Sequence, residues 1–211
     1  MKIHIKNGRL IDPKSNLDGQ HDIYIAERRI LSVGKAPADF VADQVIDAAG
    51  LIVMPGLMDV AARLREPGYE YKATLESEMT AAVAGGVTSL ACPPDTDPPL
   101  DEPGLVEMLK HRAKSLNQCR VFPVGALTKG LAGAEITEMN ELTEAGCKAF
   151  GQADEALTDT RVMMRAMQYA ATFDYRVWLR PQDSYLAKNG VAHDGEVAAR
   201  LGLPTIPVIA E

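Results

Sequence analysis

The stretch Pro55–Gly68, which reads PGLMDVAARLREPG, marks the point at which this sequence changes from one kind of fold to another. Residues 57–60 predict a short strand, and the charged segment that ends in Pro67 and Gly68 predicts a loop directly after it. Before this stretch the pattern indicates only short strands. After it, strands and helices alternate to the end of the chain.

The alternation predicts a parallel sheet covered by helices, because parallel neighbours need a crossover connection that is usually helical. One helix is expected to stop at Gly85-Gly86, a C-terminal glycine signal. The alternation alone leaves open a barrel and an open doubly wound sheet. The expected strands are 57–60, 87–92, 119–125, 147–150 and 176–179, and the expected helices are 72–84, 102–115, 135–145 and 158–172.

Residues 1–54 predict a small β domain, and residues 55–211 a second domain. Alternating apolar residues and turn signals indicate short strands in the first domain, and the charged tetrad Ala26–Arg29 suits a hairpin connection. No residue in this part has obvious catalytic character. We therefore expect it to have a packing role.

The composition restricts the classes of protein that need be considered. The 211 residues are 46% hydrophobic and carry a net charge of −7, which disfavours nucleic acid or an anionic membrane as a partner. No apolar run approaches bilayer length, and the N-terminus lacks the apolar core of a signal peptide. Three scattered cysteines, Cys92, Cys119 and Cys147, indicate reduced thiols. A cytoplasmic protein is expected.

The opening stretch resembles the first barrel strand and loop of the dihydroorotases, a branch of the amidohydrolase superfamily. Their pattern is Pro-Gly-x-x-Asp-x-His-x-His-x-Arg-Glu-Pro-Gly, and its two histidines bind zinc. Here Ala61 and Arg63 stand at the histidine positions. A methyl group has no lone pair, and a guanidinium is a permanent cation without an acceptor.

The resemblance favours a barrel, so the expected fold is α/β. It has an N-terminal small β-sandwich portion followed by an incomplete (β/α)8 TIM-type barrel with about five strand-helix units. Active relatives would continue through three more strands. An unclosed sheet exposes strand edges. We therefore expect a fragment of a longer product, a proteolysed core or one half of an assembly, and a homo- or hetero-oligomer.

The other zinc-ligand positions that the resemblance implies are also changed. Gln152 and Ala153 occupy the acidic positions after the fourth strand, although a slip of one residue would bring in Asp154. Arg180 replaces the ligand histidine after the fifth strand. Active family members use zinc, but we expect no metal here. The chain's histidines, none of them at ligand spacing, are His4, His21, His111 and His193.

The substrate side of the resemblance is kept only in part. Arg65 matches the family arginine that pairs with the dihydroorotate carboxylate, a role that suits the planar guanidinium. A salt bridge with Glu66 or another acid is an equally good interpretation of Arg65. Asp95 places a negative charge where the family has an asparagine, which works against dihydroorotate and offers Arg65 a new partner.

In a barrel, Arg63, Arg65 and Arg180 would all project toward the C-terminal rim. Three fixed cations in one cleft repel a divalent metal and need compensating charge. We therefore predict an internal ion-pair network in place of zinc, with an anion-binding pocket as the alternative. The acids expected to take part are Asp59, Asp95, Asp154 and Asp183.

These features favour a catalytically inactive dihydroorotase homologue. The resemblance implies a role in pyrimidine biosynthesis as a structural partner of aspartate carbamoyltransferase, since selection for assembly preserves packing surfaces without preserving an active site. One alternative is an active zinc-dependent dihydroorotase whose ligands come from a missing C-terminal half. Another is an anion- or metabolite-binding module that uses the arginine cluster.

Overall fold

The computed structural model describes all 211 residues, which form two compact units, Met1–Gly56 and Leu57–Glu211. The first unit contains a four-stranded sheet in the order β5-β4-β1-β6 and a three-stranded sheet in the order β3-β2-β7. The strands of these two sheets are β1 (Lys2–Lys6), β2 (Arg9–Asp12), β3 (Leu17–Gln20), β4 (Ile23–Ala26), β5 (Arg29–Val33), β6 (Gln44–Asp47) and β7 (Ile52–Val53), with a 3-10 turn at Pro13–Ser15.

The predicted hairpin at Ala26–Arg29 is confirmed. Strands β4 and β5 pair antiparallel, and Ala26 faces Arg29 in the register. The two residues between them, Glu27 and Arg28, have φ values of 51° and 62°. Two successive left-handed residues form the tight turn whose twist matches that of the flanking strands.

The second unit is built on five parallel strands in the order β12-β11-β10-β9-β8. Spatial neighbours are also neighbours in the sequence, as in a TIM barrel, whereas a doubly wound sheet reverses direction at a switch point. The prediction of an incomplete TIM-type barrel is therefore confirmed. Its strands are β8 (Leu57–Asp59), β9 (Val87–Cys92), β10 (Arg120–Ala126), β11 (Ala149–Gly151) and β12 (Val177–Trp178).

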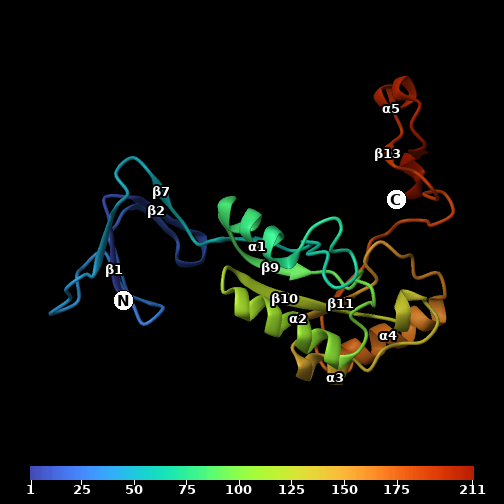
Figure 1. The fold of residues 1–211 in the computed structure, drawn as a ribbon, viewed down its shortest axis with the longest axis horizontal. Helices are drawn as coiled ribbons and strands as arrows, with labels where there is room; N and C mark the ends of the chain where they lie inside the picture. Colours follow the sequence, from blue (N-terminus) through green and yellow to red (C-terminus); the bar gives the residue numbers. More distant parts are fainter. The chain divides into compact units, whose positions relative to one another are not determined.

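Helices connect these strands, and α2 lies along β10 (Figure 1). The main core fills the space between helices and sheet, with Leu90, Leu109, Leu142 and Phe150 almost completely buried. Burial of such side chains is the main force that stabilises this layer. The helices are α1 (Leu75–Ala84), α2 (Pro103–Leu116), α3 (Met139–Ala145) and α4 (Thr160–Thr172), with a 3-10 turn at Lys129–Leu131.

Two expectations about the helices were wrong. The helix expected from residue 135 begins at Met139, because Ile136 forms a β-bridge with Thr128 and keeps this segment extended. The helical spacing of the methionines in 158–172 also predicts a core position for them. Met164 and Met167 are instead 54% and 47% exposed, and the smaller residues of α4 face the sheet. Those buried residues are Val162, Ala166 and Ala170.

The last part of the chain contains elements that the strand-helix pattern did not indicate. Strands β13 (Ala192–His193) and β14 (Thr205–Ile206) form a parallel pair, with α5 (Glu196–Leu201) between them and a 3-10 turn at Val208–Ala210. Each strand has only two residues, too short for a periodic signal. No helix in the structure combines the length and apolar character that crossing a bilayer requires.

Candidate functional site

The residues singled out in the sequence follow the carboxyl ends of the parallel strands. Arg63 lies in the loop after β8, Asp95 in the loop after β9, Asp154 after β11 and Arg180 after β12. The carboxyl ends of parallel strands lie at one end of the sheet, which is where barrel proteins place their binding sites. The fold thus brings together side chains from four loops.

Arg63 links three of these loops through one guanidinium group. Its Nε donates to Asp95 Oδ2 at 2.5 Å, and its Nη2 donates to Asp154 Oδ2 at 2.5 Å. The Arg63 side chain is 29% exposed, so the two ion pairs are partly shielded from water. Charge-assisted bonds of this kind are shorter and stronger than neutral ones.

Asp154 also accepts a hydrogen bond from a second arginine, Arg180. Arg180 Nη1 lies 3.3 Å from Asp154 Oδ1, and Arg180 Nη2 donates to Glu211 Oε1 at 2.9 Å. The two arginines therefore share one carboxylate, and each has one further acid. We call Arg63, Asp95, Asp154, Arg180 and Glu211 the rim cluster.

The electrostatics of the rim cluster hold both arginines firmly in the charged form. Burial alone would lower the pKa of Arg63, but the hydrogen bond and charge of Asp95, together with the charge of Asp154, outweigh it and raise that pKa. Hydrogen bonds to Glu211 and Asp154 raise the pKa of Arg180. Neither guanidinium can become a metal ligand.

Gln152 is fully buried and forms hydrogen bonds at both ends of its amide. Its Oε1 accepts from the Thr128 backbone N–H at 3.1 Å and from the Thr128 hydroxyl at 2.9 Å. Its Nε2 donates to the Leu131 carbonyl at 3.1 Å. Gln152 thus fastens the loop after β10 to the end of β11. The next residue, Ala153, has a left-handed backbone with φ of 51° and offers no donor atom.

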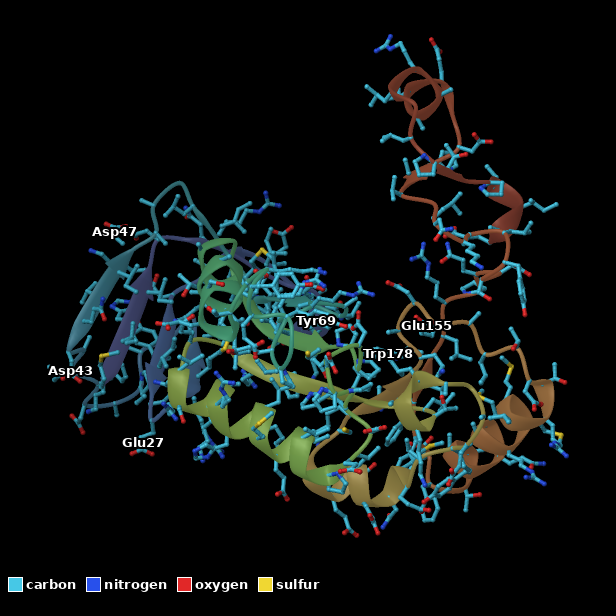
Figure 2. All side chains as sticks on the ribbon, turned by 45° about the vertical axis from the view of Figure 1, so that its right-hand side comes forward. Glu27, Asp43, Asp47, Tyr69, Glu155 and Trp178 are labelled. Carbon is cyan, nitrogen blue, oxygen red and sulfur yellow. The ribbon has the colours of Figure 1, made fainter.

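A cavity of about 360 Å³ adjoins the rim cluster, and both Arg63 and Arg180 line it. The rest of its wall is largely apolar, and Ala61, at a degenerate ligand position, contributes a methyl group. Trp178, Glu155 and Tyr69, labelled in Figure 2, come from β12 and from the loops after β11 and β8 at this end of the sheet. The apolar lining residues are Val60, Pro93, Pro94, Val124, Trp178 and Leu179.

The proposed pairing of Arg65 with Glu66 was wrong, and so was its pairing with Asp95. Glu66 accepts from Arg112 Nη2 at 2.7 Å and from the Leu75 backbone N–H at 3.0 Å, while Asp95 pairs with Arg63. Arg65 forms no ion pair. No local pattern pointed to Arg112, which is 46 residues from Glu66.

Arg65 instead lines a second cavity, of about 740 Å³. It has a left-handed backbone with φ of 63°, a conformation that is uncommon outside glycine. Lys72 lines the same cavity, and its ammonium group lies 5.1 Å from the centre of the Tyr69 ring. Arg65 thus forms no ion pair with the rim cluster, although Asp95 and Asp154 of that cluster line the same cavity.

Two of the four acids expected in the network lie elsewhere in the hydrogen-bond pattern. Asp59 accepts from the Ala61 backbone N–H at 2.9 Å. Asp183 accepts from the backbone N–H groups of Tyr185 and Leu186 at 2.8 and 2.9 Å. Both carboxylates stabilise turns, a common use of aspartate in loops. Glu211, which the sequence did not single out, takes part in their place.

The residues at the former ligand positions do not fit zinc. Ala61 and Ala153 have no donor, Arg63 and Arg180 are cations, and the amide of Gln152 is already bonded to protein groups. No group of three or more His, Cys, Asp or Glu side chains is placed to share a metal ion. The four histidines lie on separate segments: His4 on β1, His21 after β3, His111 on α2 and His193 on β13.

Comparison with known proteins places this geometry in context. The family model described as Dihydro-orotase-like matches residues 50–211. A dihydroorotase-like protein of Pseudomonas aeruginosa is 46% identical over the whole chain, and a dihydroorotase of Syntrophotalea carbinolica is 41% identical. The chain covers 50% and 49% of those two proteins. It spans about half the length of the curated relatives it matches.

Solved structures show the same fold at low sequence identity. An L-hydantoinase (dihydropyrimidinase) from Arthrobacter aurescens superimposes with a TM-score of 0.74 at 19% identity, over 88% of this chain and 42% of the other. A D-hydantoinase gives a TM-score of 0.69 at 21% identity, over 89% and 41%. The fold is that of a TIM-type barrel protein, with five parallel strands in this chain. The chain belongs to the dihydroorotase-like family.

Proposed function

We propose that this chain is part of a catalytically inactive member of the dihydroorotase-like family. Its role is structural: it supports aspartate carbamoyltransferase, an enzyme of pyrimidine biosynthesis, by assembling with it. This proposal concerns the whole protein, and the chain spans about half the length of its curated relatives.

The observation that carries the proposal is the pairing of Arg63 with Asp95 and Asp154. The resemblance places zinc at the position of Arg63, and a guanidinium there supplies a fixed positive charge that bridges two loops. Such a group can hold the loops together, but it has no open coordination position at which to activate water. The pairing favours a structural role over hydrolysis.

The changes at the remaining ligand positions support the same conclusion. Gln152 uses both ends of its amide to fix neighbouring backbone, and Ala61 faces a largely apolar cavity. Two relatives at 46% and 47% identity are named dihydroorotase-like proteins, while others at 38–42% are named dihydroorotases. This chain therefore keeps the family's barrel strands, while the residues at its zinc-ligand positions are changed.

Catalysis is tested by zinc content and by turnover. The purified protein is expected to contain no stoichiometric zinc by mass spectrometry and to hydrolyse no dihydroorotate above the buffer rate. The double variant Ala61→His and Arg63→His is the matched control, since it restores two donors but leaves Gln152, Ala153 and Arg180 unchanged. Turnover by the unaltered protein would establish the alternative of an active zinc-dependent dihydroorotase.

Assembly is tested by co-expression with the aspartate carbamoyltransferase of the same organism. The two proteins are expected to co-elute from gel filtration at a mass above that of either alone. Carbamoyltransferase activity should be higher in the complex than in the isolated subunit. Separate elution at micromolar concentrations of both proteins would contradict the structural role.

A second candidate function follows from Arg65. Its guanidinium forms no ion pair and shares a cavity with Lys72, so this pair could receive an anionic group, although four acids that line the same cavity oppose it. These acids are Asp95, Asp97, Asp154 and Glu155. In that case the protein would be an anion- or metabolite-binding module. Calorimetric titration with dihydroorotate and with carbamoyl phosphate, repeated on Arg65→Gln, separates this function from a purely structural one.

A further inference from the structure

The amino end of the same sheet contains a cavity that the proposed function does not use. It has a volume of about 350 Å³ and lies between the last turns of α2 and the first residues of β10. Figure 1 shows α2 running beside β10. We call it the basal cavity. It is lined by Lys110, His111, Ala113, Lys114, Asn117, Cys119, Arg120, Val121 and Phe122.

The basal cavity is basic and has no acidic residue in its wall. Lys110, Lys114 and Arg120 are cations, and His111 also lines the cavity. None of these four forms an ion pair with a carboxylate. The chain as a whole carries a net charge of −7, so this concentration of unpaired positive charge runs against its overall composition.

Helix stability explains only part of this charge. Lys114 lies in the last turn of α2, where a cation interacts favourably with the helix dipole. Lys110 donates to the Ala145 carbonyl at 2.7 Å, at the end of α3. Arg120 begins β10 and has no such helical role. Neither Arg120 nor Lys114 has a carboxylate partner within the chain.

Part of the wall of the basal cavity is apolar. Ala113 is buried against the core, and the half-buried side chains of Val121 and Phe122 complete the surface. A small-molecule site of this size combines a largely apolar wall with a few polar groups that fix orientation. A wall that combines cations with apolar residues suits a ligand with an anionic head and an apolar or planar body.

We propose that the basal cavity binds a small organic phosphate, with the phosphate held by Lys114 and Arg120 and the organic body against Val121 and Phe122. A phosphate monoester carries nearly two charges at neutral pH, which matches two unpaired cations. The site lies at the opposite end of the strands from the rim cluster. Its ligand is therefore independent of the proposed structural function and of the Arg65 cavity.

Three probe molecules separate the contribution of the anionic head from that of the planar body. Phenyl phosphate contains both the anionic head and the planar body, whereas inorganic phosphate and phenol each contain one. By calorimetric titration of the 211-residue chain, phenyl phosphate is expected to bind with a dissociation constant of about 1 mM or tighter. Each partial probe should bind at least tenfold more weakly.

Cys119 reports whether the probe occupies this cavity and not another. It lines the basal cavity and is half-buried, whereas Cys92 and Cys147 are 1% and 2% exposed. At ten times its dissociation constant, phenyl phosphate should slow maleimide labelling of Cys119 about tenfold by mass action. Mass spectrometry of the labelled peptide measures this rate.

Charge-removing variants provide the decisive comparison. The double variant Lys114→Gln and Arg120→Gln should weaken phenyl phosphate binding at least tenfold and abolish protection of Cys119. Lys35→Gln removes an exposed lysine of the other unit and should change neither measurement. Circular dichroism establishes that each variant is folded. Absence of binding at 10 mM, binding without protection of Cys119, or equal binding by the double variant would each overturn the proposal.

Discussion

The two ends of the five-stranded sheet both present arginine side chains, but they differ in what surrounds them. At the carboxyl end, Arg63 and Arg180 pair with acids from three other segments. At the amino end, Lys114 and Arg120 line a cavity without any carboxylate. The first set of charges is compensated within the chain, and the second is not.

This difference separates a structural charge from a binding charge. A paired guanidinium that links several loops contributes to stability, and removing it leaves carboxylates that repel one another. An unpaired cation contributes little to stability and gains a partner only when a ligand arrives. The same residue type thus has opposite expected phenotypes at the two ends.

The largest expected effect is in thiol reactivity, which distinguishes Cys119 beside the basal cavity from the two thiols buried in the core. Burial raises the pKa of Cys92, at the carboxyl end of β9, from 9.0 to about 12, and it does the same for Cys147. Cys119 lies beside the basal cavity and is half-buried, although burial raises its pKa as well. With a disulfide reagent at pH 8, Cys119 is expected to react at least a hundredfold faster than the other two thiols.

The same shifts predict how stability depends on pH. The folded-state pKa of Cys92 and Cys147 exceeds their ordinary value of 9.0, so the unfolded chain loses these protons first. Their contribution is complete below pH 9 and is lost as pH rises toward 12. Urea unfolding should show this loss, and the double variant Cys92→Ala and Cys147→Ala should lack it.

Equal labelling rates for all three cysteines in the native protein would contradict the buried placement of Cys92 and Cys147.

The next largest effect is on the free energy of unfolding and concerns Gln152, whose buried amide bonds to the loop after β10. Gln152→Ala removes three hydrogen bonds and leaves the Thr128 N–H and hydroxyl without their acceptor in a buried site. The free energy of unfolding should fall by about 2–4 kcal/mol, measured by urea denaturation. Gln168→Ala, on the exposed face of α4, is the matched control and should cost less than about 0.5 kcal/mol.

The sequence predicted the strands that carry the rim cluster, but it did not predict which residues of the cluster pair with one another. The strand-helix alternation placed all five barrel strands, and the changed ligand positions identified Arg63 and Arg180 as neighbours. It named Asp95 and Asp154 among four candidate acids but could not pair them with Arg63, because they lie 32 and 91 residues from it and meet it only through loop geometry. Local patterns carry secondary structure, whereas these contacts depend on the tertiary fold.

Burial and long-range partners were also hard to predict for polar side chains and for methionine. Glu66 is buried and bonds to Arg112, 46 positions away. Gln152 was expected at the rim of the site but is fully buried. Met164 and Met167 have the spacing of a core face but lie on the exposed side of α4. Periodicity identifies a helix, yet smaller neighbours such as Ala166 can turn its buried face away from the larger side chains.

Arg63 and Arg120 provide the most direct test of the comparison between the two ends. Arg63→Met removes a shared cation and leaves Asp95 facing Asp154, so stability should fall by about 1–2 kcal/mol. Arg120→Met removes an unpaired cation and should change stability by less than about 0.5 kcal/mol. Both are measured by urea unfolding at low and high salt. A similar loss in the two variants would remove the distinction between compensated and free charge.

The smallest expected effect lies at the exposed margin of the rim cluster. Arg180 and Glu211 are 46% and 58% exposed, and ion pairs in water contribute little because solvent screens them and their side chains lose freedom. Glu211→Gln should therefore lower stability by no more than about 0.5 kcal/mol, and 0.5 M salt should remove the difference. Asp154→Asn changes the carboxylate that both arginines share, so its cost should be larger and should persist in part at high salt. If Glu211→Gln proved as costly as Asp154→Asn, the shared carboxylate would not be the centre of the cluster, and the linkage between loops would have to run through Arg180.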